Sequence, residues 1–347
     1  MSAPIVVVTG ASAGIGRAVS VAFARRGWSV VLLARGRERL DSAARDVEDA
    51  GGRALALQVD MAEASAVEDA ASQAVAAFGR IDVWVNNAMA TIYSPVSEIT
   101  PEEVRRVTEV TYLGQVHGTL AALRHMRPRD EGVIVQIGSA LSYRSIPLQS
   151  AYCAAKFAVR GFTDALRSEL LHEGSRIRLT MVQLPAVDTP QFDWARSRLP
   201  SRLQPVPPIH APEAIAEAIL RAANETPREL WVGAPTLQAI LGTMAAPEIL
   251  DGMMARQAWD GQMTGEPARP RPDNLFEAPP GDPGTRGRFT ERSRRDVVAI
   301  SGTNARRFLA AGAIGALASA ASLGFWLGGR RACSRDRLLS ARERAAV

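Results

Sequence analysis

Cysteine is almost absent from this chain. Only Cys153 and Cys333 stand among its 347 residues, which excludes a disulfide-stapled scaffold. Neither has histidine or cysteine neighbours at the spacing of zinc ligands, so we expect no metal site. Aromatic residues make up only 5% of the chain, but 47% of its residues are hydrophobic, which is enough for a sizeable buried core.

Lysine is scarcer still. Lys156 is the only lysine among 41 basic residues, and all the others are arginine. A lysine at this one position suggests a site that needs a compact ammonium with a tunable pKa rather than a planar guanidinium. A lysine left by chance is the alternative until its neighbours are considered.

Positive charge is concentrated near the C-terminus. Residues 1–264 carry a net charge of −2, whereas residues 265–347 carry +7. The larger part of the chain is therefore not expected to bind nucleic acid. An anionic membrane surface is the better partner for a basic segment next to an apolar run.

Short apolar runs alternate with helical patterns over residues 1–240. The expected strands are Ile5–Val8, Ser29–Ala34, Ala54–Val59, Ile81–Val85, Val133–Ile137, Ile177–Val182 and Glu229–Val232. The expected helices are Gly14–Gly27, Glu38–Ala50, Ala62–Phe78, Pro101–Met126, Tyr152–His172 and Pro212–Asn224. This alternation predicts an α/β domain with one doubly wound parallel sheet and helices on both faces.

The remaining chain divides into three further parts. We expect a catalytic domain over residues 1–250, a flexible linker rich in Pro, Gly and Arg over 251–305, an apolar helix over 306–331 and a basic tail over 332–347. Phe308–Gly329 contains no charged residue, and 22 helical residues span about 33 Å, enough to cross a bilayer. A membrane anchor and a helix packed on another subunit are the two interpretations. The catalytic domain is expected in the cytoplasm, because the first residues lack a secretory leader.

A glycine-rich loop follows the first expected strand. In Thr9–Gly16, glycines would let the backbone approach a pyrophosphate at the start of a helix. Gly10, Ser12, Gly14, Ile15 and Gly16 are therefore expected to bind a dinucleotide. Arg35 ends the second strand region, where an acidic residue would favour NAD and an arginine favours the 2′-phosphate of NADP(H). A tight turn and a solvated surface arginine are the structural alternatives.

A phenol and the only ammonium stand four residues apart on one helix face. A cation such as Lys156, together with a positively charged oxidised nicotinamide, would lower the pKa of Tyr152 toward the range of acid–base catalysis. Ser139 follows an expected strand at the edge of the sheet where ligands bind. Its hydroxyl could hold a substrate oxygen while Tyr152 exchanges the proton.

With these motifs the chain resembles the short-chain dehydrogenase/reductase family over about residues 4–235. Besides the glycine loop, the resemblance rests on Asp60, Asn86-Asn87-Ala88, Ser139 and the pair Tyr152 and Lys156. It implies a Rossmann-type sheet of about seven strands, a homo-oligomer and a substrate bound above the same sheet. It also implies cofactor contacts, with Asp60 and Met61 at the adenine, Asn87 and Ala88 near the adenosine ribose, Lys156 at the nicotinamide ribose, Val187 at the carboxamide, and Tyr152 and Thr189 nearby.

Three positions depart from the family pattern. Thr111 stands where the family usually has an asparagine that holds a water of the proton relay, so the relay is either weaker or altered. Leu184-Pro185 replaces a usual Pro-Gly, and Met89 replaces a glycine. Tyr143 could line the substrate pocket or only pack, and Pro190, Phe192 and Trp194 could form an apolar lid or an ordinary loop.

The motifs support an NADP(H)-dependent enzyme that interconverts an alcohol and a carbonyl compound. A lipophilic small molecule is the expected substrate. Two alternatives remain at this point: a nucleotide-binding scaffold or sensor impaired by Thr111, and a lyase or epimerase that retains its cofactor. The histidines are scattered, so structural roles are expected for them.

Overall fold

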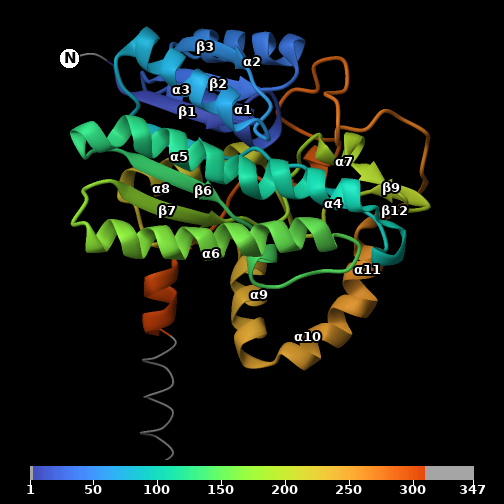
Figure 1. Cartoon of the computed structure of the whole chain (residues 1–347). Helices are drawn as coiled ribbons and strands as arrows, with labels where there is room; N and C mark the ends of the chain where they lie inside the picture. Colours follow the sequence, from blue (N-terminus) through green and yellow to red (C-terminus); the bar gives the residue numbers. More distant parts are fainter. Residues whose placement is uncertain (1–2, 309–347) are drawn as a thin grey trace, which may run out of the picture. The chain divides into compact units, whose positions relative to one another are not determined.

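An eight-stranded sheet forms the centre of the fold in the computed structural model, which describes residues 3–308. The strand order is β14-β11-β7-β6-β4-β1-β2-β3 (Figure 1). The strands are β1 Ile5–Thr9, β2 Ser29–Ala34, β3 Arg53–Gln58, β4 Val83–Asn86, β6 Val133–Ile137, β7 Arg178–Gln183, β11 Glu229–Val232 and β14 Ala299–Ser301. The seven strands expected from the sequence are present, and β14 is an additional one from the segment expected to be a linker.

Seven of the eight strands, all except β14, pair in parallel, because helices connect them across both faces. In the register, Val6 of β1 lies opposite Val30 of β2 and Val83 of β4. Both faces are covered, which explains why β1 and β2 are continuous apolar runs without polar alternation. The strand order reverses between β1 and β4, which opens a ligand crevice at the carboxyl ends of these strands.

Two hydrophobic clusters lie on opposite faces of the sheet. One joins the sheet to α1 (Gly14–Ala24), α2 (Arg37–Asp49) and α8 (Pro212–Glu225). The other joins it to α3 (Ala64–Phe78), α5 (Gly114–Met126) and α6 (Ser150–His172), and Figure 1 shows α4, α5 and α6 as neighbours. The doubly wound arrangement predicted from the sequence is confirmed.

The long helix expected over Pro101–Met126 is interrupted. It consists of α4 (Pro101–Thr108), a π-helical turn (Glu109–Leu113) and α5. Thr100 and Glu103 form a reciprocal capping box at the start of α4, which satisfies exposed backbone donors there. The π-helical turn cannot be read from periodicity, because it shifts the helix by only one residue.

The region after β11 is more structured than a linker. It contains α9 (Ala234–Ala245), α10 (Pro247–Met253), a π-helical turn (Met254–Ala258) and α11 (Trp259–Gly261). Three small ladders pair β5 (Ile92–Tyr93) with β8 (Arg196–Ser197), β9 (Ser201–Leu203) with β12 (Met263–Pro267), and β10 (Ile209–His210) with β13 (Ser293–Arg294). The short helix α7 covers Gln191–Trp194.

Met1–Ile300 form one compact unit and residues 301–347 a second. The first unit therefore extends 50 residues beyond the boundary expected at residue 250. Of the second unit, residues 302–308 are helical. In the part of the chain between residues 3 and 308, no helix is both long enough and apolar enough to cross a membrane. Nearly all of the apolar helix expected over 306–331 lies outside the described residues, as does the tail over 332–347.

Candidate active site and cofactor site

Ser139 is held at the carboxyl end of β6. Its side-chain oxygen accepts a hydrogen bond of 3.1 Å from the backbone amide of Leu141, which caps a short 3-10 turn. Its own backbone amide donates to Oε1 of Gln183 at 2.9 Å. These contacts fix the hydroxyl at the sheet edge where the parallel arrangement places ligands.

Tyr152 and Lys156 are about one turn apart on α6, and both lie next to Ser139. The Nζ atom of Lys156 is 5.6 Å from the centre of the Tyr152 ring, and it donates a hydrogen bond of 2.7 Å to the carbonyl oxygen of Ile137. The hydroxyls of Tyr152 and Ser139 interact through a hydrogen bond. The structure thus brings together the three side chains that the sequence analysis proposed as a catalytic set.

Burial dominates the acid–base behaviour of this pair. It raises the pKa of the Tyr152 phenol, and the hydrogen bond with Ser139 only partly opposes this. It lowers the pKa of Lys156 to about 7, because a buried ammonium loses its hydration. Burial therefore sets the pKa of the Tyr152 phenol in this structure, and the lowering expected from Lys156 together with an oxidised nicotinamide stays a prediction.

Thr111 is fully buried in the π-helical turn. Its hydroxyl donates to the carbonyl oxygen of Ala90 at 2.8 Å and accepts from the amide of Ala90 at 2.9 Å. Both backbone groups of one loop residue are therefore satisfied by this single side chain. Thr111 positions the loop after β4, a role that the family pattern did not indicate.

Residues of the glycine loop and of three strand ends line a cavity of about 180 Å³. It contains most of the residues expected to bind the cofactor: Gly10, Ser12, Gly14, Ile15, Arg35, Asp60, Met61, Ala88 and Thr189. Gly14 has a φ of +55°, a conformation that glycine adopts most readily. A Cβ atom at Gly16 would collide with the carbonyl oxygen of Gly10.

Five of the expected cofactor residues do not line this cavity: Tyr152 and Lys156, which lie on α6, and Gly16, Asn87 and Val187. Gly16 packs behind the loop, and Asn87 donates its side-chain amide to the carbonyl oxygen of Thr9 at 2.9 Å. Val187 is buried and forms a bridge with His210. Asp60, expected at the adenine, forms an ion pair with Arg106. Arg39 and Pro279 line the cavity but were not found from the sequence.

A segment from the end of the first unit crosses this cavity. We call residues 274–290 the C-terminal strap. Arg35 donates to the carbonyl oxygens of Asn274 at 2.5 Å and Phe276 at 2.9 Å. The amide of Gly14 donates to the carbonyl oxygen of Gly284 at 3.2 Å. Donors expected to bind phosphate are thus occupied by oxygens of the chain itself.

Charged side chains anchor the strap. Asp282 accepts hydrogen bonds from Arg17 at 2.5 Å and from Ser42 at 2.6 Å. At the other end, the fully buried Asp188 accepts from the amide of Phe289 at 3.0 Å and from Thr290 at 3.1 Å. The flexible linker expected over 251–305 is therefore wrong for this part, because its composition does not reveal the partners that hold it.

The donors around the glycine loop suit an anionic, oxygen-rich ligand. In this structure, carbonyl oxygens of the strap accept hydrogen bonds from these donors. Arg39, for example, donates to the carbonyl oxygen of Gly281 at 3.1 Å. Arg35 and Arg39 bring two guanidinium groups to one wall of the cavity, and the loop adds backbone N–H groups. Such a set fits the phosphates of a dinucleotide.

The three aromatic residues expected near the site have different surroundings. Trp194 lines the glycine-loop cavity, where the guanidinium of Arg39 lies 4.8 Å from its ring centre. The ring of Phe192 is 6.3 Å from that of Tyr93. Tyr143 donates its hydroxyl to the buried Glu229 at 2.7 Å, which supports the packing interpretation for this residue.

Comparison with known proteins places these features in a family. The model of the short chain dehydrogenase family matches residues 4–199. The "uncharacterized oxidoreductase YxnA" of Bacillus subtilis is 32% identical, covering 86% of this chain and 87% of its own. A fatty acyl-CoA reductase of Acinetobacter baylyi is 29% identical, covering 72% of this chain and 83% of its own.

A solved structure gives the same result. The alcohol dehydrogenase of the archaeon Thermococcus sibiricus, complexed with 5-hydroxy-NADP, matches with a TM-score of 0.56 and 28% identity. The match covers 66% of this chain and 96% of that enzyme. This chain therefore matches nearly the whole length of that enzyme.

Proposed function

The chain belongs to the short-chain dehydrogenase family of oxidoreductases, and from that premise we propose that it interconverts an alcohol and a ketone or aldehyde with NADP(H). The observation that carries the proposal is the convergence of Ser139, Tyr152 and Lys156 at the carboxyl end of β6. Fold alone would not support an activity, but this set offers a proton carrier beside a hydroxyl that can hold an oxygen.

Ser139, Tyr152 and Lys156 have different roles at the substrate oxygen. A bound nicotinamide cofactor supplies or accepts the hydride. Ser139 donates its hydroxyl hydrogen to the carbonyl oxygen, and Tyr152 gives its proton to that oxygen in reduction or takes it back in oxidation. Lys156, whose pKa is about 7 in the protein, bears positive charge next to the phenol in part of the population and stabilises the phenolate.

The cofactor site uses the residues around the glycine loop. Gly10, Ser12, Gly14, Ile15 and Gly16 would hold the pyrophosphate, and Arg35 with Arg39 would hold the 2′-phosphate. The remaining roles follow the family: Asp60 and Met61 at the adenine, Asn87 and Ala88 near the ribose, Lys156 at the nicotinamide ribose, and Val187 and Thr189 at the nicotinamide. The Thermococcus sibiricus relative, complexed with 5-hydroxy-NADP, supports the choice of NADP(H).

The proposal also covers the kind of substrate, attachment to a membrane and the oligomeric state. The rings of Tyr93 and Phe192 pack together, and such apolar surroundings suit a lipophilic substrate. The charge-free run Phe308–Gly329, bracketed by arginine pairs, would hold the enzyme at a membrane where such substrates dissolve. We further propose that the protein forms homo-oligomers, as the family does.

Substitution of Tyr152 by phenylalanine tests the activity. Ketones and aldehydes of graded lipophilicity are screened by the loss of NADPH, and we expect Tyr152→Phe to lose at least a factor of about 100 in kcat, the contribution typical of acid–base catalysis. Cofactor binding, measured by calorimetry, should persist because the shape is kept. A variant that retains more than about a tenth of the rate contradicts the mechanism.

The same screen separates the two alternatives. A scaffold or sensor would bind NADPH without consuming it. A lyase or epimerase with a retained cofactor would convert substrate without net oxidation of added NADPH. Either result would replace the proposed function.

A further inference from the structure

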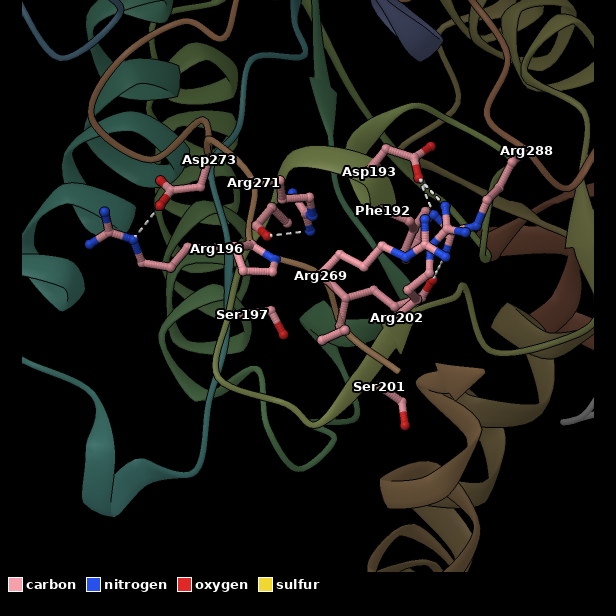
Figure 2. Close-up of a pocket in the computed structure, with 14 residues that line it drawn as sticks. Phe192, Asp193, Arg196, Ser197, Ser201, Arg202, Arg269, Arg271, Asp273 and Arg288 are labelled. Carbon is pink, nitrogen blue, oxygen red and sulfur yellow. Dashed lines mark hydrogen bonds and ion pairs between the residues drawn. The ribbon is translucent and has the colours of Figure 1, made fainter. Parts of the chain in front are cut away.

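A second cavity lies between the α7–β9 region and residues 268–288. Its volume is about 470 Å³, within the range of about 300–1,000 Å³ that is usual for small-molecule sites. It shares no lining residue with the glycine-loop cavity. Figure 2 shows five arginines around it: Arg196, Arg202, Arg269, Arg271 and Arg288. We call it the arginine pocket.

Acidic residues neutralise only part of this charge. Asp193 and Asp273 are the two carboxylates in the lining. Asp193 is shared by Arg288 and by Arg202, the latter at 3.6 Å. Asp273 pairs with Arg196 at 2.8 Å. Two carboxylates outside the lining also pair with these arginines, Glu103 with Arg196 at 3.1 Å and Glu266 with Arg202 at 2.6 Å, so four carboxylates face the five arginines.

Two of the arginines have no carboxylate partner in the described chain, residues 3–308. Arg271 donates to the carbonyl oxygen of Ala195 at 2.9 Å, which leaves its other donors available. The Arg269 side chain makes no hydrogen bond or ion pair within those residues, and in Figure 2 it extends across the pocket toward Arg202 and Arg288. Unpaired guanidinium groups that converge on one cavity are the usual means of binding phosphate.

Two aromatic residues, Phe192 and Tyr93, connect the pocket with the region of the proposed catalytic tyrosine. Phe192 belongs to its lining, and the Phe192 ring is 6.3 Å from that of Tyr93. Tyr93 is close enough to Tyr152 that, besides the main effect of burial, the phenol of Tyr152 raises the pKa of Tyr93. The ladder between β5 and β8 pairs Tyr93 with Ser197, which also lines the pocket.

We propose that the arginine pocket binds the phosphate groups of an elongated substrate whose carbonyl carbon is held at Ser139 and Tyr152. This inference rests on the proposed function. The apolar stem of such a substrate would lie against Tyr93 and Phe192, and its anionic end would pair with Arg269 and Arg271. Two guanidinium groups without an ion-pair partner among residues 3–308 offer more donors than a single carboxylate can accept, which favours a phosphate-bearing end.

Binding of inorganic pyrophosphate tests the pocket without any need for turnover. Calorimetry on the full chain compares the wild type with Arg269→Gln/Arg271→Gln, and with Arg45→Gln as a control. Arg45 is an exposed arginine on α2 that lines neither cavity. We expect the double variant to bind at least ten-fold more weakly and the control to bind like the wild type. Equal binding by the double variant, or none by the wild type, overturns the proposal.

Pyrophosphate could also occupy the glycine loop, so Arg35→Gln is titrated in the same way. If affinity falls in Arg35→Gln and not in the double variant, the ion sits at the cofactor site and the arginine pocket is not a phosphate site. If affinity falls in the double variant alone, the pocket is the site. These outcomes separate the two sources of the same chemistry.

Kinetics then connect the pocket to the substrate. A long-chain aldehyde with a terminal phosphate is compared with the same aldehyde without it. We expect a higher kcat/KM for the phosphorylated form, and the ratio of the two values should fall at least ten-fold in Arg269→Gln/Arg271→Gln but not in Arg45→Gln. Turnover of both aldehydes with equal kcat/KM overturns the inference alone, whereas turnover that survives Tyr152→Phe overturns the proposed function.

Discussion

The backbone amide of Gly14 donates a hydrogen bond of 3.2 Å to the carbonyl oxygen of Gly284. The two residues are 270 positions apart in the sequence, yet the donor belongs to the loop proposed to hold the pyrophosphate. Arg35 repeats this relationship with the carbonyl oxygens of Asn274 and Phe276. The C-terminal strap therefore uses the same hydrogen-bond donors that a bound dinucleotide would need.

Loosening the strap should strengthen cofactor binding. Asp282→Asn weakens the contacts of the strap with Arg17 and Ser42. The strap then covers the cofactor site in a smaller fraction of molecules, so the apparent Kd for NADPH falls. We expect NADPH to bind roughly two- to five-fold more tightly, in line with an ion pair worth about 0.5–1 kcal/mol. Calorimetry checks this, with the exposed Asp69→Asn on α3 as the matched control. Weaker binding in Asp282→Asn would mean that the strap helps to hold the cofactor.

Arg35 should determine the choice between the two cofactors. A charge-assisted contact with the 2′-phosphate is worth about 1.5–3 kcal/mol, or roughly ten- to a hundred-fold in affinity. We expect wild type to prefer NADPH by that factor and Arg35→Asp to prefer NADH. Because Arg35 also holds the strap, the ratio of the two Kd values is the quantity to measure. Arg37→Asp, at an exposed position two residues away, should keep the wild-type ratio. Equal or tighter NADH binding by wild type would falsify the assignment.

Lys156 should make the stability of the protein depend on pH. Its pKa is about 7 in the folded protein and ordinarily 10.5, so between these values the unfolded chain binds more protons than the folded protein. The free energy of unfolding therefore rises with pH over this window, by at most about 1.4 kcal/mol per pH unit. Urea denaturation of wild type and Lys156→Met at several pH values measures the difference. A difference that stays constant above pH 7 rules out the lowered pKa.

Thr111 should contribute to stability rather than to proton transfer. Thr111→Val keeps the shape of the side chain but leaves the amide and carbonyl groups of Ala90 without their partner. A buried polar group without a hydrogen-bond partner lowers the free energy of unfolding by about 1–3 kcal/mol, so the urea midpoint should fall. Thr108→Val is the control, because the exposed hydroxyl of Thr108 bonds only to Val104 of its own helix. A normal midpoint together with a large loss of kcat would restore Thr111 as a relay residue.

The proposed anchor is tested by fractionation. The full chain is compared with a version that ends at Ala305, both in high salt, which screens purely basic attraction to lipid. We expect the full chain in the membrane pellet and the shorter one in the supernatant with its NADPH affinity unchanged. A full chain in the supernatant contradicts anchoring by Phe308–Gly329.

The sequence by itself determined the parts of this protein whose signal is local. Buried parallel strands are continuous apolar runs, so β1, β2 and β6 could be placed from their residues alone. The four-residue spacing of Tyr152 and Lys156 fixes their common helix face, and the position of Ser139 after a strand fixes its place at the sheet edge. The glycine loop was equally readable, because close backbone approach restricts Gly14 and Gly16 to glycine.

Only the tertiary structure decided the features that depend on distant partners. Composition predicted a flexible linker where the strap lies, since Pro and Gly do not reveal that Arg35, Arg39 and Asp188 will bind it. The pKa of Lys156 depends on how completely its surroundings exclude water. Arg269 and Arg271 are ordinary charges in the sequence, and they converge because β8 and β9 lie beside the segment that carries them.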